Sequence, residues 1–165
     1  MKSKTLRFIL GGALAAAAFA LVPAGVADAA DGKALFGSMC DPIMGAENVQ
    51  GQKFFHDFTG IRNYGTTTNM VMCPVVRDNN GNVDGLPALK LRLQGKGVAI
   101  TCSTAEISDT GSRLKTVTKT SAAVTGPLAL DFGNTLNHST VGGGYAIQCD
   151  LPVGSAVSLI TYDEP

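Results

Sequence analysis

The sequence predicts an all-β protein, an antiparallel two-sheet β-sandwich of about seven or eight strands with two disulfides. Apolar residues recur at every second position, turn residues interrupt them about every ten positions, and no segment has a convincing amphipathic helix pattern. A flattened barrel and an immunoglobulin-like topology are the alternatives. The immunoglobulin alternative is less favoured because the chain has no tryptophan to fill the usual buried position.

The first 29 residues have the pattern of a helical export signal. Its basic start contains Lys2, Lys4 and Arg7, its apolar stretch covers residues 8–22, and a small-x-small cleavage site follows at Ala27-Asp28-Ala29. The apolar stretch has about 15 residues, fewer than the roughly 20 that span a bilayer. No cysteine stands at the cleavage site to carry a lipid anchor. We therefore expect cleavage after Ala29.

Removal of the signal leaves one predicted domain over residues 30–165, without stable membrane insertion. We expect this domain to be secreted or periplasmic, in a bacterium. Its net charge is about −2 and its basic residues are scattered, so no surface is predicted for nucleic acid or anionic membrane.

Strand alternation is clearest over residues 88–94, where Leu89, Leu91 and Leu93 alternate with polar residues. Gly95-Lys96-Gly97 is predicted to form a hairpin turn into a strand over residues 98–103, with Val98, Ile100 and Cys102 on one face. Further strands are predicted over residues 53–58, 70–76, 115–122, 128–132, 145–151 and 157–162, whereas residues 31–52 are expected to be irregular. Phe54, Phe55 and Phe58 are expected to belong to the core.

Four cysteines follow the export signal, so we expect them to be oxidised. Cys102 and Cys149 share a face with apolar strand neighbours and are expected to pair in the core, which leaves Cys40 for Cys73. Four cysteines allow three connectivities, so this pairing is a hypothesis. The loops closed would span about 34 and 48 residues and stabilise the fold by about 4 kcal/mol each. Their spacing does not suit a zinc site, and no metal or cofactor is expected.

Two polar loops are the candidate functional segments. The first carries oxygen side chains at alternate positions, Asp78, Asn80, Asn82 and Asp84, as calcium loops do, but Val83 and Leu89 stand where an EF-hand needs glycine and glutamate. A polar hairpin turn between residues 70–77 and 88–94 is therefore favoured over a calcium site. The second loop, residues 133–144, contains Asn137 and His138.

No residue is predicted to be catalytic. His56 and His138 are not tied by spacing to a nucleophile, and no hydrolase, metalloprotease, phosphate-binding or dinucleotide motif is present. We expect an exported, non-enzymatic binding or surface-interaction protein with a cell-surface or extracellular ligand. A secreted hydrolase with a carboxylate acid and base pair, a carbohydrate-binding module, and a surface or fimbrial-type assembly subunit remain as alternatives. Carbohydrate is less favoured because few aromatic residues are expected at the surface.

The cysteine segments also carry a resemblance. The Cys-Pro-Val-Val-Arg-Asp run at residues 73–78, Thr101-Cys102, and the run from Tyr145 to Pro152 form a C...CP...C...YxIxCxLP framework. This framework resembles a loose group of uncharacterised exported bacterial β-sandwich proteins. The resemblance implies the fold, export and the disulfides, and it implies no activity, substrate or cofactor.

Overall fold

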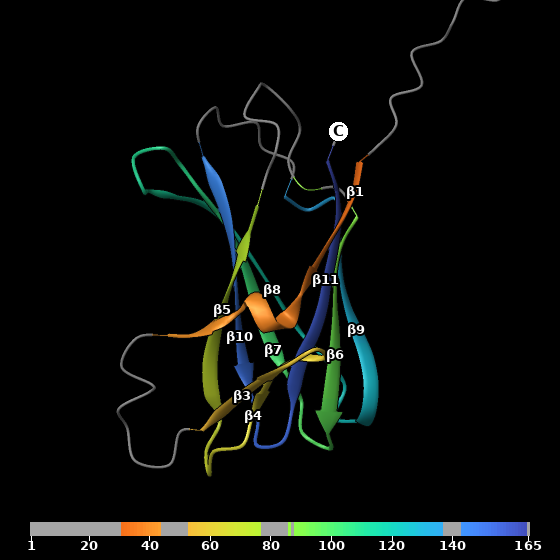
Figure 1. Cartoon of the computed structure of the whole chain (residues 1–165). Helices are drawn as coiled ribbons and strands as arrows, with labels where there is room; N and C mark the ends of the chain where they lie inside the picture. The colour runs from red at the N-terminus through yellow and green to blue at the C-terminus, as the bar shows by residue number, and fades with distance from the viewer. Residues whose placement is uncertain (1–30, 44–52, 77–85, 87, 137–142, 165) are drawn as a thin grey trace, which may run out of the picture.

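The computed structural model describes residues 31–43, 53–76, 86, 88–136 and 143–164, so the predicted export signal lies outside the described residues (Figure 1). The described chain contains eleven strands, one short 3-10 turn and no α-helix: β1 (Asp31–Phe36), η1 (Gly37–Met39), β2 (Asp41–Pro42), β3 (Phe54–Asp57), β4 (Gly60–Asn63), β5 (Asn69–Val75), β6 (Leu89–Lys96), β7 (Thr101–Ile107), β8 (Arg113–Thr120), β9 (Thr125–Gly133), β10 (Gly144–Leu151) and β11 (Ala156–Glu164). Among these described residues, no helix is long and apolar enough to cross a membrane.

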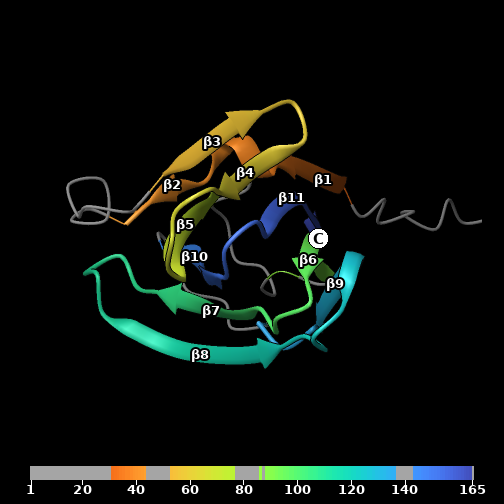
Figure 2. The same cartoon turned by 90° about the horizontal axis from the view of Figure 1, so that it is seen from below.

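The strands form two antiparallel sheets, which confirms the predicted sandwich. One sheet has the order β3-β4-β11-β6-β9, with β1 also paired to β11. The other has the order β2-β5-β10-β7-β8. Figure 2 shows β5, β10 and β7 on one side of the molecule and β11, β6 and β9 on the other. We call them the six-stranded and the five-stranded sheet.

The core between the sheets follows the predicted alternation. Leu89, Leu91 and Leu93 of β6 are buried, while residues between them are partly or fully exposed. β10 alternates in the same way along its whole length, and it buries Tyr145, Ile147, Cys149 and Leu151. Successive strand side chains point to opposite faces, so a period of two in the sequence becomes one buried face of a sheet.

Both predicted hairpin connections are wrong, because they join strands of different sheets. β6 pairs with β9 and β11 and ends at Lys96, whereas β7 begins at Thr101 and pairs with β8 and β10, so residues 97–100 carry the chain from one sheet to the other. Gly97 has φ of +78°, and Val98 beyond it is 53% exposed instead of buried. β5 and β6 also belong to different sheets, so the segment between them does not close a hairpin. A tight glycine turn and a sheet crossing have similar composition, and alternation alone does not identify a strand's partner.

The N-terminal segment is not wholly irregular, contrary to expectation. β1 pairs antiparallel with β11 from Asp31 opposite Glu164 to Phe36 opposite Leu159, and β2 pairs with β5. β1 was missed because the apolar residues of its sequence, DGKALF, are consecutive and do not alternate with polar ones, and because its partner lies at the other end of the chain. β1 therefore completes a sheet of its own chain, which is not the free strand that a donated-strand assembly would need.

Candidate binding site

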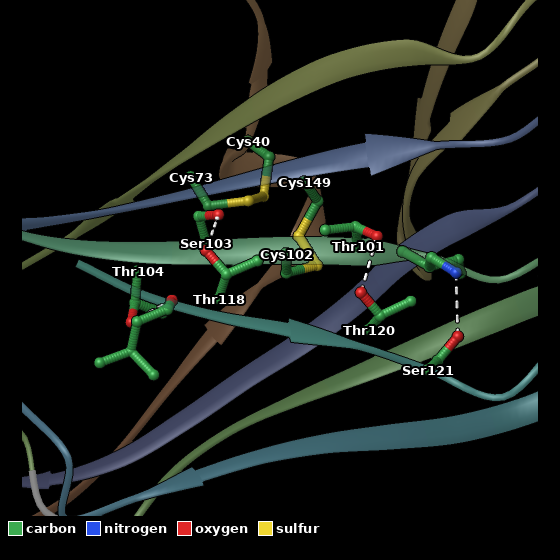
Figure 3. The surroundings of a disulfide bond; sticks show 12 residues. Cys40, Cys73, Thr101, Cys102, Ser103, Thr104, Thr118, Thr120, Ser121 and Cys149 are labelled. Carbon is green, nitrogen blue, oxygen red and sulfur yellow. Dashed lines mark hydrogen bonds between the residues drawn. A yellow bond between two sulfur atoms is a disulfide. The ribbon is translucent and has the colours of Figure 1, made fainter.

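The cysteines form the two disulfides that the strand pattern favoured, Cys40–Cys73 and Cys102–Cys149 (Figure 3). Cys102 lies directly opposite Cys149 in the pairing of β7 with β10, and Cys73 lies on β5 of the same sheet. Both bridges therefore stabilise the five-stranded sheet and neither joins it to the six-stranded sheet. The described chain has no free cysteine, so it offers no thiol for catalysis.

The residues singled out in the two polar loops lie outside the described residues: Asp78, Asn80, Asn82, Asp84, Asn137 and His138. The described residues beside them do meet. The backbone N–H of Leu86 donates to the carbonyl of Leu136 at 2.6 Å, and the N–H of Ala88 donates to Oδ1 of Asn134 at 3.0 Å. The fold thus joins the end of the first loop to the start of the second. No group of three or more metal-ligating side chains occurs among the described residues.

Two of the described carboxyls, Asp57 and Asp131, do not suit general-acid chemistry. Hydrogen bonds from Thr59, first of all from its hydroxyl, lower the pKa of Asp57, and the Lys90 ammonium lowers the pKa of Asp131. A glycosidase acid requires a raised pKa, so neither carboxyl suits that role. His56 is exposed, and its Nδ1 lies 3.1 Å from the backbone oxygen of Ser38.

The hairpin of β3 and β4 exposes an aromatic surface that the sequence analysis placed in the core. Phe54 is half-buried against the core, but Phe55 is 55% exposed and Phe58, in the turn, is 96% exposed. Tyr64, just after β4, is 57% exposed. Neighbouring residues of a strand face opposite sides, so the adjacent pair Phe54-Phe55 was a signal that one ring would face outward.

Phe55 and Tyr64 form an edge-to-face pair on the outer face of this hairpin. Their ring centroids are 6.2 Å apart and their planes meet at 86°. Phe55 lies opposite Arg62 in the strand register, and the Tyr64 N–H donates to the carbonyl of Lys53 at 2.6 Å. Lys53, Phe54, Phe55 and Tyr64 line a shallow pocket of about 400 Å³. We call Lys53, Phe55, Arg62 and Tyr64 the aromatic platform.

Buried contacts beneath the platform hold it in place. Nδ2 of Asn63 donates to the carbonyls of Thr67 at 2.8 Å and Leu151 at 2.7 Å, and its Oδ1 accepts from the Gly65 N–H at 2.8 Å. Asn63 is completely buried, so these bonds fix the backbone on both sides of Tyr64 in a low-dielectric site.

Two further contacts attach the hairpin to the rest of its sheet. Nη1 of Arg62 donates to the Gly154 carbonyl at 2.6 Å. Gly60, with φ of +130°, lies so close to β11 that an added Cβ would be 1.8 Å from the carbonyl oxygen of Val157. The aromatic rings are therefore exposed on a well-anchored hairpin, as a preformed ligand surface requires.

Comparison with known proteins identifies no family for this chain. No family model matches the chain, and no match was found among curated proteins. Among solved structures it is similar to the GH26-CBM35 beta-(1,4)-mannanase of Podospora anserina, with a TM-score of 0.45 and 8% sequence identity. The match covers 82% of this chain and 28% of that one, so the chain spans less than a third of that protein's length.

Proposed function

We propose that this chain is an exported, non-catalytic binding protein whose aromatic platform binds carbohydrate. The observation that carries the proposal is the pair of exposed rings, Phe55 and Tyr64, held edge to face on an anchored hairpin. Contact between aromatic side chains and water is unfavourable, and a ligand that covers the rings removes that contact. A cluster of exposed aromatic side chains therefore marks an interaction surface.

The polar groups around the rings suit a sugar. A pyranose ring presents C–H groups on its faces, which pack on aromatic rings, and hydroxyls at its edge, which need hydrogen-bonding partners. Lys53 is exposed at the rim of the pocket, and Arg62 lies across the strand pair from Phe55. One apolar surface with a few polar groups at its edge is the usual composition of a ligand site.

Export is supported by the leader and by the disulfides. Two disulfides are typical of proteins that fold in an oxidising compartment, outside the bacterial cytosol. An extracellular or periplasmic glycan would be accessible to a protein in that compartment.

The test is retention of the mature protein on a panel of neutral polysaccharides in affinity gel electrophoresis. Phe55→Ala and Tyr64→Ala should each weaken binding about five- to thirtyfold, because each removes an apolar face worth about 1–2 kcal/mol. Leu114→Ala is the matched control, since Leu114 is an exposed apolar residue, 45% accessible, on β8 of the other sheet.

Melting temperatures separate binding from folding. Both aromatic rings are more than half exposed, so their removal should change the melting temperature little. Undiminished retention of the Phe55→Ala, Tyr64→Ala double variant would refute the platform, and wild-type protein that no polysaccharide retards would refute carbohydrate as its ligand.

A further inference from the structure

The outer face of the five-stranded sheet carries a groove that the aromatic platform does not involve. Its floor follows from strand register. Asp41 of β2 lies opposite Met72 of β5, Met72 opposite Gln148 of β10, Gln148 opposite Ser103 of β7, and Ser103 opposite Thr118 of β8. This row crosses all five strands, a distance of roughly 19 Å at the usual spacing of about 4.8 Å.

A second row runs beside the first and has shorter side chains. Pro74 lies opposite Ala146, Ala146 opposite Ala105, and Ala105 opposite Thr116. The residues that alternate with both rows, such as Val71, Cys73 and Ile147, are buried, so the two rows face outward. Small side chains in the middle of the sheet leave a depression between the edge strands.

One end of the groove is an apolar well of about 570 Å³. It is lined by Asp41, Pro42, Ile43, Met72, Pro74, Tyr145 and Ala146. Met72 has an apolar side chain and is 43% exposed. A methionine side chain is flexible and can adapt its shape to a ligand. The volume and the apolar lining are those of small-molecule sites.

A disulfide fixes the edge strand β2, which forms one wall of this well. β2 contains only two residues, and the Cys40–Cys73 disulfide, buried on the inner side, attaches it to β5. The N–H of Ile43 also donates to the carbonyl of Met70 at 3.2 Å. The disulfide therefore holds the well open as a preformed site, which lowers the entropic cost of binding.

The other end of the groove is polar. It has a volume of about 380 Å³ and shares Met72 and Ala146 with the well, so the two parts are continuous. The hydroxyls of Ser103 and Thr118 lie 2.8 Å apart, and either can donate to the other (Figure 3). Gln148 adds an amide with donors and acceptors. Of the described residues that line this part, Arg113 alone is charged.

We infer that this groove binds an amphipathic molecule with an apolar chain and an uncharged, hydroxylated head, the chemistry of a glycolipid. The apolar chain would occupy the well between Met72 and Pro42, where it is removed from water. The head would exchange hydrogen bonds with Gln148, Ser103 and Thr118, which can serve as both donors and acceptors. The Asp41 carboxylate, which lines the well, disfavours an anionic head at that end because like charges repel.

The probe is n-octyl β-D-glucoside below its micelle-forming concentration, with binding to the disulfide-bonded mature protein measured by calorimetry. Glucose represents only the hydroxylated head of this probe, and octanoate represents only its apolar chain. Each should bind at least tenfold more weakly than octyl glucoside. Ala146→Leu places a larger side chain where the two parts meet and should weaken octyl glucoside binding about tenfold or more. Met72→Ser, which removes the apolar side chain from the well, should act in the same direction.

Thr120→Ala is the matched control, because Thr120 faces outward on β8 opposite Thr101, outside the described lining of the groove. It should bind the probe as wild type does. Phe55→Ala should also bind it normally, which separates this site from the aromatic platform on the other sheet.

Three outcomes would overturn the inference. The first is no detectable binding of octyl glucoside, and the second is unchanged binding by Ala146→Leu at an unchanged melting temperature. The third is octanoate binding as tightly as octyl glucoside and being lost in Arg113→Ala, which would identify an anionic head.

Discussion

The two sheets of this sandwich are stabilised by different chemistry. The five-stranded sheet contains both disulfides, and Cys102–Cys149 joins residues that already face each other in its ladder. The six-stranded sheet has no cysteine in its strands. It relies on close backbone approach, with Gly37 and Gly60 both against the Val157 carbonyl, and on an ion pair of 3.2 Å between Lys90 and Asp131.

The difference shows how the two proposed surfaces depend on their supports. The groove lies on the sheet that contains both disulfides, and one of its walls is attached by the Cys40–Cys73 disulfide. The aromatic platform lies on the sheet in which Gly60 fits closely against β11 and in which Asp57 and Asp131 have lowered pKa values. Each support can be removed separately, so the comparison can be tested.

The largest effect is expected from the Cys102→Ala, Cys149→Ala double variant. Loss of a bridge that spans 47 residues should lower the free energy of unfolding by about 4 kcal/mol, because the unfolded chain regains conformational freedom. Guanidinium unfolding followed by circular dichroism measures this change, with the wild type under the same buffer as reference. A loss below about 1 kcal/mol would show that strand pairing, and not the bridge, holds this sheet together.

A smaller loss is expected from Gly60→Ala in the six-stranded sheet. An added methyl group would meet the backbone oxygen of Val157 at 1.8 Å, and φ of +130° strains any residue with a Cβ. We expect a loss of about 3 kcal/mol in unfolding free energy, from overpacking and backbone strain together.

Gly126→Ala isolates the backbone contribution to that loss. Gly126 has φ of +111° on β9 of the same sheet, and an added Cβ there would meet nothing within 4 Å. Its loss should be about 1 kcal/mol. Equal losses for the two variants would show that contact with Val157 does not anchor the hairpin.

The smallest change in unfolding free energy is expected when the pH is lowered. The folded pKa of Asp57 and of Asp131 lies below the ordinary value of 3.8, so each contributes stability that is complete at neutral pH. That contribution should disappear as the pH falls below 3.8 through the lower folded values. Both carboxyls are solvent-exposed, so the change is small.

The measurement is the urea midpoint between pH 5 and pH 2. The Asp57→Asn, Asp131→Asn double variant should lose less stability over this range than the wild type, and its hydrogen exchange should change only in the six-stranded sheet. If the urea midpoints of the wild type and the variant decrease equally as the pH falls, other carboxyls cause the acid sensitivity.

Sequence reasoning succeeded where the pattern is local. The alternation of Leu89, Leu91 and Leu93 identified a buried strand face, and the inward position of Cys102 and Cys149 indicated a pair that the structure does form. It failed at β1 and β4, which are short or weakly apolar and obtain their stability from β11, far away in the chain. No local pattern carries that information.

The candidate sites were predicted less well than the fold. The site residues chosen in the polar loops are outside the described residues, and Phe55 and Phe58 were assigned to the core because aromatic residues usually pack there. Their exposure depends on the position of a four-residue strand at the sheet edge. The groove depends on register across five strands, so it could not be derived from any one segment.

Local sequence patterns were enough to predict which side of most strands is buried, which cysteines could meet, and that these cysteines are oxidised. These properties follow from the two-residue period of a strand and from thiol chemistry, both of which are local. Which sheet each strand joins is a property of the tertiary structure, and so are the crossing between sheets at residues 97–100 and the single row that contains Asp41, Met72 and Thr118. Strand pairing is a contact between distant segments, and the same alternating pattern fits several partners until the whole core is packed.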